Sequence, residues 1–185
     1  MIMPPALRKL TLAVHLTVSI GWIGAVAGYI ALDVTAAAGR DADTLRFAYL
    51  GMERIAVSVI VPLALASLLT GLIVSLGTKW GLFRHYWVLI SLVLTTLATL
   101  VLLSETRTIS AYAEVATDPT TSGEELRALG STLLHSVGGT LVLLVVLVLN
   151  IYKPRGLTRY GWRKEQQRKV LAAGRGERPR EPSQP

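Results

Sequence analysis

Cysteine is absent from all 185 residues of the chain, and this absence excludes several kinds of chemistry at once. Without thiols the protein has no disulfide, no cysteine-ligated iron–sulfur cluster and no thiol nucleophile. The sequence also lacks a glycine-rich phosphate-binding loop, a nucleophile paired with a base, and histidines and carboxylates at metal-ligand spacing. It therefore indicates no catalytic residue and no metal-binding residue, and it favours a non-enzymatic protein.

Acidic residues are missing from the middle of the long apolar runs that dominate the chain. Four such runs occur, at residues 10–32, 55–76, 87–104 and 131–152. Each is close to the ~20 residues that a helix needs to cross a bilayer core of about 30 Å. We therefore expect an all-α integral membrane protein, a four-helix antiparallel bundle in which the first and fourth helices can be neighbours.

Positive charge is concentrated at the termini and in the short middle loop. Residues 153–185 alone carry ten Lys and Arg against three Asp and Glu, whereas the two longer loops hold more acids than bases. Because basic loops stay in the cytoplasm, this distribution predicts that both termini are cytoplasmic. The arginine-rich composition is typical of a high-GC bacterium, so we expect the cytoplasmic (inner) membrane. The first run is too long for the apolar core of a signal peptide and is expected to remain uncleaved.

The chain divides into a four-span transmembrane domain at residues 1–152 and a basic cytoplasmic segment at residues 153–185. Lys and Arg beside a membrane helix are attracted to anionic lipid headgroups by about 1 kcal/mol per charge. We therefore expect lipid, and not nucleic acid, to be the partner of this segment, despite the net charge of +7. Its last part, residues 174–185, has the Gly, Pro, Arg and Glu content that is typical of disorder.

Shorter features predict how the helices bend and begin. Pro62 lies inside the second run, where it takes away the amide that would bind the carbonyl of Ser58, so we expect a kink. Residues 45–52 are expected to form a short interfacial helix in the first outer loop. In the second outer loop, Ser122 and Glu125 have the spacing of a capping box, which predicts a helix start outside the bilayer.

Two histidines inside the runs are the candidate cofactor-binding residues, His15 in the first and His135 in the fourth. Imidazole is a common ligand of haem iron, and Gly138 and Gly139 beside His135 would leave room for a flat macrocycle. Alternatively, both histidines donate to hydroxyls or carbonyls and pin the bundle. At ~1.5 Å per residue, His15 lies roughly 8 Å to the cytoplasmic side of mid-span and His135 roughly 9 Å to the outer side. One haem bound by both histidines is therefore disfavoured.

A stripe of small residues lies on the first helix, nearly opposite to His15. Gly24 and Gly28 have the small-xxx-small spacing that lets a second helix approach closely. Ordinary packing within the bundle and a homo-oligomer seam both fit this pattern.

The carboxylates nearest the runs lie at their outer ends. These are Asp33, Glu53 and Glu105, and Arg54 and Arg107 are close enough in sequence to pair with them. A proton-coupled antiporter usually needs a carboxylate deep in the membrane, so this placement disfavours that class. A small-molecule transporter would instead need a cavity lined by the Pro62 kink and by a hydroxyl stripe on the third helix, Ser91, Thr95 and Thr99.

Two groups of motifs resemble known families. The run from His15 to Gly24 is similar to the first-helix His…Trp-x-Gly pattern of the copper-resistance-D-like superfamily of membrane domains. Residues 80–87 and 152–156 more closely resemble a family of small four-helix integral membrane proteins from high-GC bacteria whose function is unknown. The likeness extends over most of residues 7–164.

This resemblance implies a four-helix membrane fold, and it assigns a ligand role to one residue. His15 alone matches the shared pattern, and it would bind haem b or copper. The methionine-rich outer surface expected for copper handling is lacking, since the methionines are Met1, Met3 and Met52. The leading interpretation is a multi-pass, non-enzymatic accessory or interaction protein; the alternative is a haem b-binding redox protein or oxidase that uses His15. An oligomeric small-molecule transporter is the third.

Overall fold

The computed structural model describes residues 3–78 and 81–174, and this part of the chain is helical apart from short connections. The elements in chain order are α1 (Pro5–Ala38), α2 (Ala42–Ile55), the π-helical turn η1 (Ala56–Ile60), α3 (Val61–Gly77), α4 (Tyr86–Thr117), α5 (Gly123–Ala128), α6 (Leu133–Tyr152) and α7 (Arg159–Gly174). The described residues contain no strand, only an isolated bridge between His85 and Leu157. The predicted all-α fold is therefore confirmed.

Four helical stretches are long and apolar enough to cross a membrane; they contain the first three predicted runs and residues 133–152 of the fourth. They are Pro5–Ala38, Ala42–Gly77, Tyr86–Thr117 and Leu133–Tyr152, with 34, 36, 32 and 20 residues. At ~1.5 Å per residue the first three are about 48–54 Å long, well beyond a bilayer core of about 30 Å, whereas α6 matches it. The chain thus has the architecture of a multi-pass membrane protein with helical extensions.

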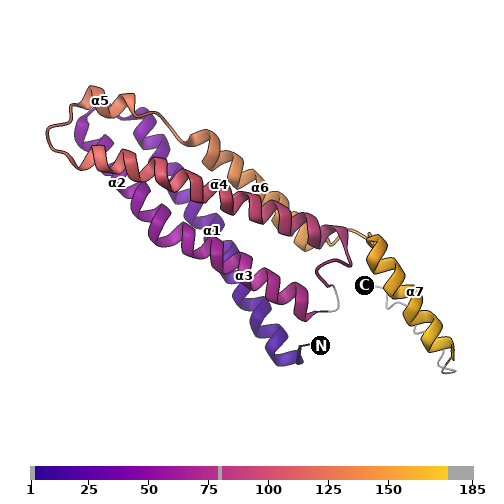
Figure 1. The fold of residues 1–185 in the computed structure, drawn as a ribbon. Coiled ribbons are helices and arrows are strands. Elements are labelled where there is room, and N and C mark those ends of the chain that lie inside the picture. The colour runs from indigo at the N-terminus through magenta and orange to yellow at the C-terminus, as the bar shows by residue number, and fades with distance from the viewer. Residues whose placement is uncertain (1–2, 79–80, 175–185) are drawn as a thin grey trace.

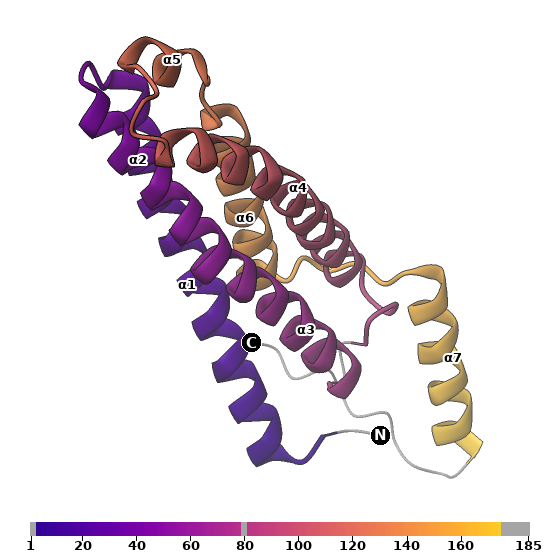
Figure 2. The same cartoon turned by 60° about the vertical axis from the view of Figure 1, so that its left-hand side comes forward.

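The long helices form one bundle, which Figures 1 and 2 show from two sides. Helix α1 packs against α2, α3 and α6, and α4 packs against the same three helices. The connection between α1 and α2 lies beside α5 at one end of the bundle, and α7 projects from the other (Figure 1). We call these the α5 end and the α7 end.

A well-packed helical cap forms the α5 end. It consists of the last turn of α1, all of α2, the second half of α4, and α5. Several of its side chains are almost fully buried: Leu45 and Met52 of α2, Ile109 of α4 and Leu126 of α5 are each 0–2% exposed. Most of the two expected outer loops is therefore helix, and the interfacial helix expected at 45–52 is part of the longer α2. The predicted capping box of Ser122 and Glu125 is confirmed, but it starts the separate helix α5, which ends at Ala128, whereas the fourth long helix, α6, begins at Leu133.

A single arginine holds the loop between α4 and α5. The guanidinium of Arg46, on α2, donates to the carbonyls of Ala116 at 2.9 Å, Thr121 at 2.6 Å and Pro119 at 3.2 Å, and also to that of Asp118. These are carbonyls that the end of α4 and the following turn leave without a helical partner. Arg46 thus ties α2 to the connection between two later helices.

The irregularity expected at Pro62 takes the form of the π-helical turn η1. This turn directly precedes the first turn of α3, where Pro62 lies. A proline cannot donate to the carbonyl four residues earlier, and a π-turn inserts one residue at the interrupted point. The stretch nevertheless remains continuous from α2 to α3.

The start of α7 is fastened to the turn before α4. The amide of Thr158 donates to the carbonyl of Arg84 at 3.0 Å, and the Arg84 guanidinium contacts Glu165 of α7 at 3.4 Å. A Cβ on Gly161 would overlap the same Arg84 carbonyl, so only glycine permits this approach. Two sequence-based features, the disordered tail at residues 175–185 and Trp80 of the 80–87 motif, lie outside the described residues.

Candidate functional site

A cavity of about 400 Å³ lies between α1, η1, α4 and α6. Ligand pockets in proteins commonly measure about 300–1,000 Å³, so this volume suits a small molecule. Much of the wall is apolar and includes Trp22, Val26, Ile60, Leu94, Leu102 and Leu143. The lining side chains with polar atoms at the end nearer the cap, which we call the polar end, are Tyr29, Glu105, Thr106, Thr132, His135 and Ser136.

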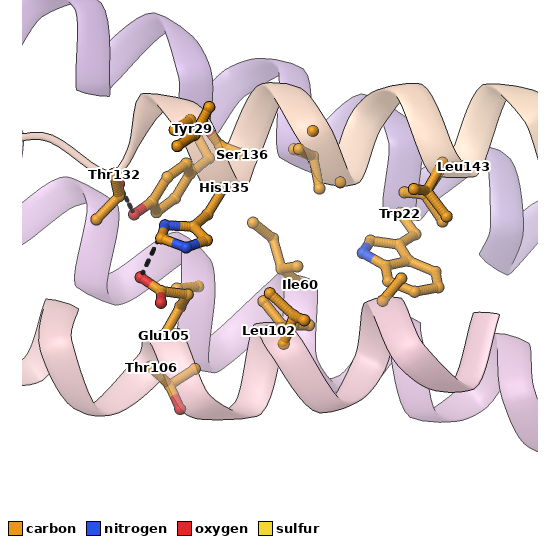
Figure 3. A pocket seen from close by; sticks show the side chains of 18 of the residues that line it. Trp22, Tyr29, Ile60, Leu102, Glu105, Thr106, Thr132, His135, Ser136 and Leu143 are labelled. Atoms are coloured by element: carbon orange, nitrogen blue, oxygen red, sulfur yellow. Dashed lines mark hydrogen bonds and ion pairs between the residues drawn. The ribbon is translucent and has the colours of Figure 1, made fainter. Parts of the chain in front are cut away.

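The cavity is elongated along the bundle. Along α6 its lining runs from Leu134 to Leu143, which is about 14 Å at a helical rise of ~1.5 Å per residue. Along α4 it runs from Leu94 to Ile109, about 22 Å by the same rise. Figure 3 shows the polar end at one side and Trp22 and Leu143 at the other. The shape suits a molecule with a polar head and an apolar body.

Two glycines of α6 leave open space beside the cavity wall that this helix forms. A Cβ placed on Gly138 or Gly139 would find no atom within 4 Å, apart from its own helix backbone and chain neighbours. Both glycines lie about one turn from His135 and line the same cavity. The open space expected beside His135 is therefore present.

His135 faces a carboxylate across the cavity. Its Nδ1 lies 3.7 Å from Oε2 of Glu105, and the two side chains are 52% and 24% exposed. Figure 3 shows the pair pointing toward one another from α6 and α4. The expected pairing of Glu105 with an arginine is therefore corrected: within residues 3–78 and 81–174, its ion-pair partner is His135 and not Arg54 or Arg107.

A second carboxylate, Asp33, is sealed behind the polar end. It is 0% exposed, and it accepts hydrogen bonds from Ser131 at 3.0 Å and from Thr132 at 2.6 Å. The Thr132 hydroxyl also lies 2.7 Å from that of Tyr29. Because Thr132 has one proton and gives it to Asp33, Tyr29 must be the donor in the second bond. Asp33 thus orients Tyr29 through Thr132, and within the described residues it forms no ion pair with an arginine, contrary to the expectation.

His15 lies outside the cavity lining. Its Nδ1 is 3.0 Å from the Thr70 hydroxyl of α3, and a Cβ on Gly71 would come within 3.2 Å of its Cε1. One turn along α1, Ser19 meets Ser67 of α3 at 2.8 Å. These contacts are those of a histidine that joins α1 to α3. The haem-ligand role that the resemblance implies for His15 stays a prediction.

The other predicted features lie away from the cavity. Ser91 accepts from Asn150 of α6 at 3.3 Å, and Thr99 donates to a carbonyl of its own helix. None of Ser91, Thr95 and Thr99 lines the cavity. Gly24 and Gly28 have no atom within 4 Å of an added Cβ, so no described helix of this chain covers them. Packing within the bundle therefore does not explain the small pair.

Sequence reasoning placed Asp33 and Glu105 at the outer ends of the runs and joined neither of them to His135 or Tyr29. The only local signal was their position next to apolar runs. Comparisons of the chain with family models, with curated proteins and with solved structures found no match. The family resemblance of the motifs therefore stays a prediction.

Proposed function

We propose that the protein is a multi-pass protein of the bacterial cytoplasmic membrane that holds a small amphiphilic molecule in the cavity between α1, α4 and α6. It acts as a non-enzymatic binding component. Its four helices cross in an antiparallel, up-down-up-down order with both termini in the cytoplasm, which the basic ends and acidic cap support. The observation that carries the binding role is the elongated cavity with polar groups at one end only.

The position of the cavity along α6 supports an amphiphilic ligand. Helix α6 has 20 residues and so matches the bilayer core in length. His135 is in its first turn, at the outer interface, whereas Leu143 lies near its middle. A ligand head at the polar end would therefore lie at the headgroup level, and its body would lie in the hydrocarbon region.

Exposed lining residues supply an entrance from the lipid. Leu134 of α6 is 82% exposed, and Leu97 and Val101 of α4 are 53% and 46% exposed. All three line the cavity. An amphiphile dissolved in the outer leaflet can therefore reach the cavity between α4 and α6 without crossing the cap.

The test compares two phenylalanine variants of α6 by native mass spectrometry of protein purified from its membrane. Gly138→Phe fills the cavity, whereas Leu141→Phe changes a 60% exposed side chain outside the lining. We expect wild type and Leu141→Phe to carry a small molecule of defined mass at one copy per chain, and Gly138→Phe to lose it. The absence of such an adduct in wild type, or its retention in Gly138→Phe, contradicts the proposal.

Haem b is the second candidate ligand, favoured by the open space at Gly138 and Gly139 beside an imidazole. His135 would bind the iron through Nε2, with Nδ1 oriented by Glu105, as metal-bound histidines are commonly oriented. Haem would supply one-electron chemistry there. An absorption spectrum of the oxidised and dithionite-reduced protein tests this: a Soret band lost in His135→Ala and kept in His15→Ala supports it. A colourless wild type rejects it.

Two further partners belong to the proposal. The helix α7 carries five Lys and Arg against one Glu, and Tyr160 and Trp162 are 54% and 59% exposed, which suits contact with anionic headgroups. The uncovered pair Gly24 and Gly28 suits a homo-oligomer seam. Neither partner contributes to the cavity, so ligand binding and assembly can be tested separately.

A further inference from the structure

The hydroxyl groups at the polar end have all given their protons to the protein. A hydroxyl has one proton and two lone pairs, so a hydroxyl that donates inside the protein offers only acceptors to a ligand. The donations run from Tyr29 to Thr132 at 2.7 Å, from Thr132 to Asp33 at 2.6 Å, from Thr106 to the Leu103 carbonyl at 2.8 Å, and from Ser136 to the Leu133 carbonyl at 3.2 Å.

The two titratable side chains at the polar end extend this pattern. An ionised Glu105 has oxygens that only accept. His135 places Nδ1 3.7 Å from Oε2 of Glu105, so a neutral ring with its proton on Nδ1 leaves Nε2 as an acceptor. Both groups therefore present lone pairs to a molecule in the cavity, as the four hydroxyls do.

The charge around the polar end is mostly negative. Glu105 lines the cavity and Asp33 lies directly behind Thr132, whereas His135 is the one described lining residue that can become a cation. The two segments that build most of the cap, residues 33–54 and 105–127, hold nine acids against five arginines. Two of those arginines, Arg46 and Arg127, donate to backbone carbonyls of the cap. The potential at the polar end therefore attracts a cation.

We propose that the cavity binds a protonated amine carried on a single apolar chain, with its ammonium group at Glu105 and Tyr29. An ammonium has three donors and no acceptor, so it complements an end built of acceptors and carboxylates. A neutral alcohol brings one donor and no charge, and a carboxylate brings more acceptors and the wrong sign. A phospholipid headgroup would place its phosphate beside Glu105, so a free single-chain amine fits the polar end better. This inference rests on the proposed amphiphile site.

Three eight-carbon probes that differ only in the head test the proposal. Octylamine is protonated at pH 7, as the lysine ammonium is, with a pKa near 10.4; octanol is neutral and octanoate is anionic. Each is titrated by calorimetry into the full-length protein in phosphatidylcholine nanodiscs, and partitioning into empty nanodiscs is subtracted. We expect octylamine to bind at least tenfold more tightly than octanol and octanoate not to bind.

Two matched variants locate the charge that matters. Glu105→Gln removes the carboxylate at the polar end, and Glu114→Gln removes an exposed carboxylate nine residues further along the same helix. We expect Glu105→Gln to weaken the binding of octylamine at least tenfold and to keep the affinity for octanol. An unchanged affinity for octanol also shows that the cavity is intact. Glu114→Gln is expected to leave both affinities unchanged.

The possible outcomes separate the two proposals. Equal binding of octylamine and octanol overturns the amine assignment and keeps the amphiphile site, whereas no binding of any probe overturns both. The role of Glu105 is overturned if both variants lose affinity for octylamine equally, or if Glu105→Gln loses affinity for octanol together with octylamine. If adding phosphatidylethanolamine to the nanodiscs displaces octylamine, a lipid headgroup and not a free amine is the occupant, which overturns the assignment.

Discussion

Arg46 is expected to hold the connection between α4 and α5 in place. The loss of local stability caused by its removal follows from its contacts. Its guanidinium donates to four carbonyls, of which those of Ala116 and Thr121 are in part-buried bonds and those of Asp118 and Pro119 in exposed ones. Hydrogen bonds to charged groups contribute about 1.5–3 kcal/mol each, and exposed ones contribute less. We therefore expect Arg46→Ala to cost about 2–4 kcal/mol of local stability.

Hydrogen exchange measures that loss at the affected amides. Opening of residues 116–129 exposes bonds such as that from the Leu126 amide to the Ser122 carbonyl, at 3.1 Å. Since 1.4 kcal/mol is a factor of ten, exchange there should accelerate about thirty- to several-hundredfold in Arg46→Ala. Arg46→Lys should recover part of the protection, because one ammonium cannot span four carbonyls in a fixed fork.

Arg54→Ala is the control for this prediction. Arg54 is exposed and lies on the same helix, α2, so its substitution changes the charge by the same amount outside the loop contact. It should leave exchange in residues 116–129 unchanged. If Arg46→Ala accelerates this segment no more than Arg54→Ala does, the guanidinium does not hold the loop and the reasoning is refuted.

Three further predictions follow from other contacts. Gly161→Ala forces a Cβ onto the Arg84 carbonyl and should cost about 1–3 kcal/mol, seen as faster exchange of the Thr158 amide, whereas Gly174→Ala, which meets no atom within 4 Å, should change nothing. The pKa of Glu125 is lowered first by the hydrogen bond from the Ser122 amide and then by that from its hydroxyl. Protection of the α5 amides from exchange should therefore be complete above the ordinary pKa of 4.5 and decline as the pH falls below it. Glu125→Gln should remove this decline while keeping the cap, and an unchanged decline contradicts the assignment. Thr132→Val separates Tyr29 from Asp33 and frees the phenol proton, so the ratio of the affinities for octylamine and octanol should fall. An unaltered ratio would show that Asp33 does not orient Tyr29.

The four long apolar helices could be predicted because their signal is local. An apolar run of about 20 residues has few alternatives to a spanning helix, whatever the rest of the chain does. The capping box at Ser122 and the irregularity at Pro62 are also local, since each depends on a few neighbouring residues. All of these features agree with the structure.

The cap was missed although part of its signal was present. Residues 33–54 and 105–127 are too polar to span a membrane, and this lower hydropathy led to the expectation of loops. Yet Leu45, Ala48, Tyr49 and Met52 follow one another at the three- and four-residue spacing of a helix face, and all are buried. Periodicity, and not mean hydropathy, was the informative signal outside the membrane.

The polar end of the cavity could not have been predicted from local pattern, because its parts come from distant segments. The carboxylate of Asp33 is bonded to hydroxyls 98 and 99 residues away, so nothing near it in sequence distinguishes a sealed acid from a solvated one. His15 and His135 were equivalent for the same reason, as imidazoles within apolar runs. The packing of α1 on α3 places one against Thr70, and the packing of α4 beside α6 places the other against Glu105. Helix pairing thus decides the surroundings of each histidine, and of these two only His135 lines the described cavity.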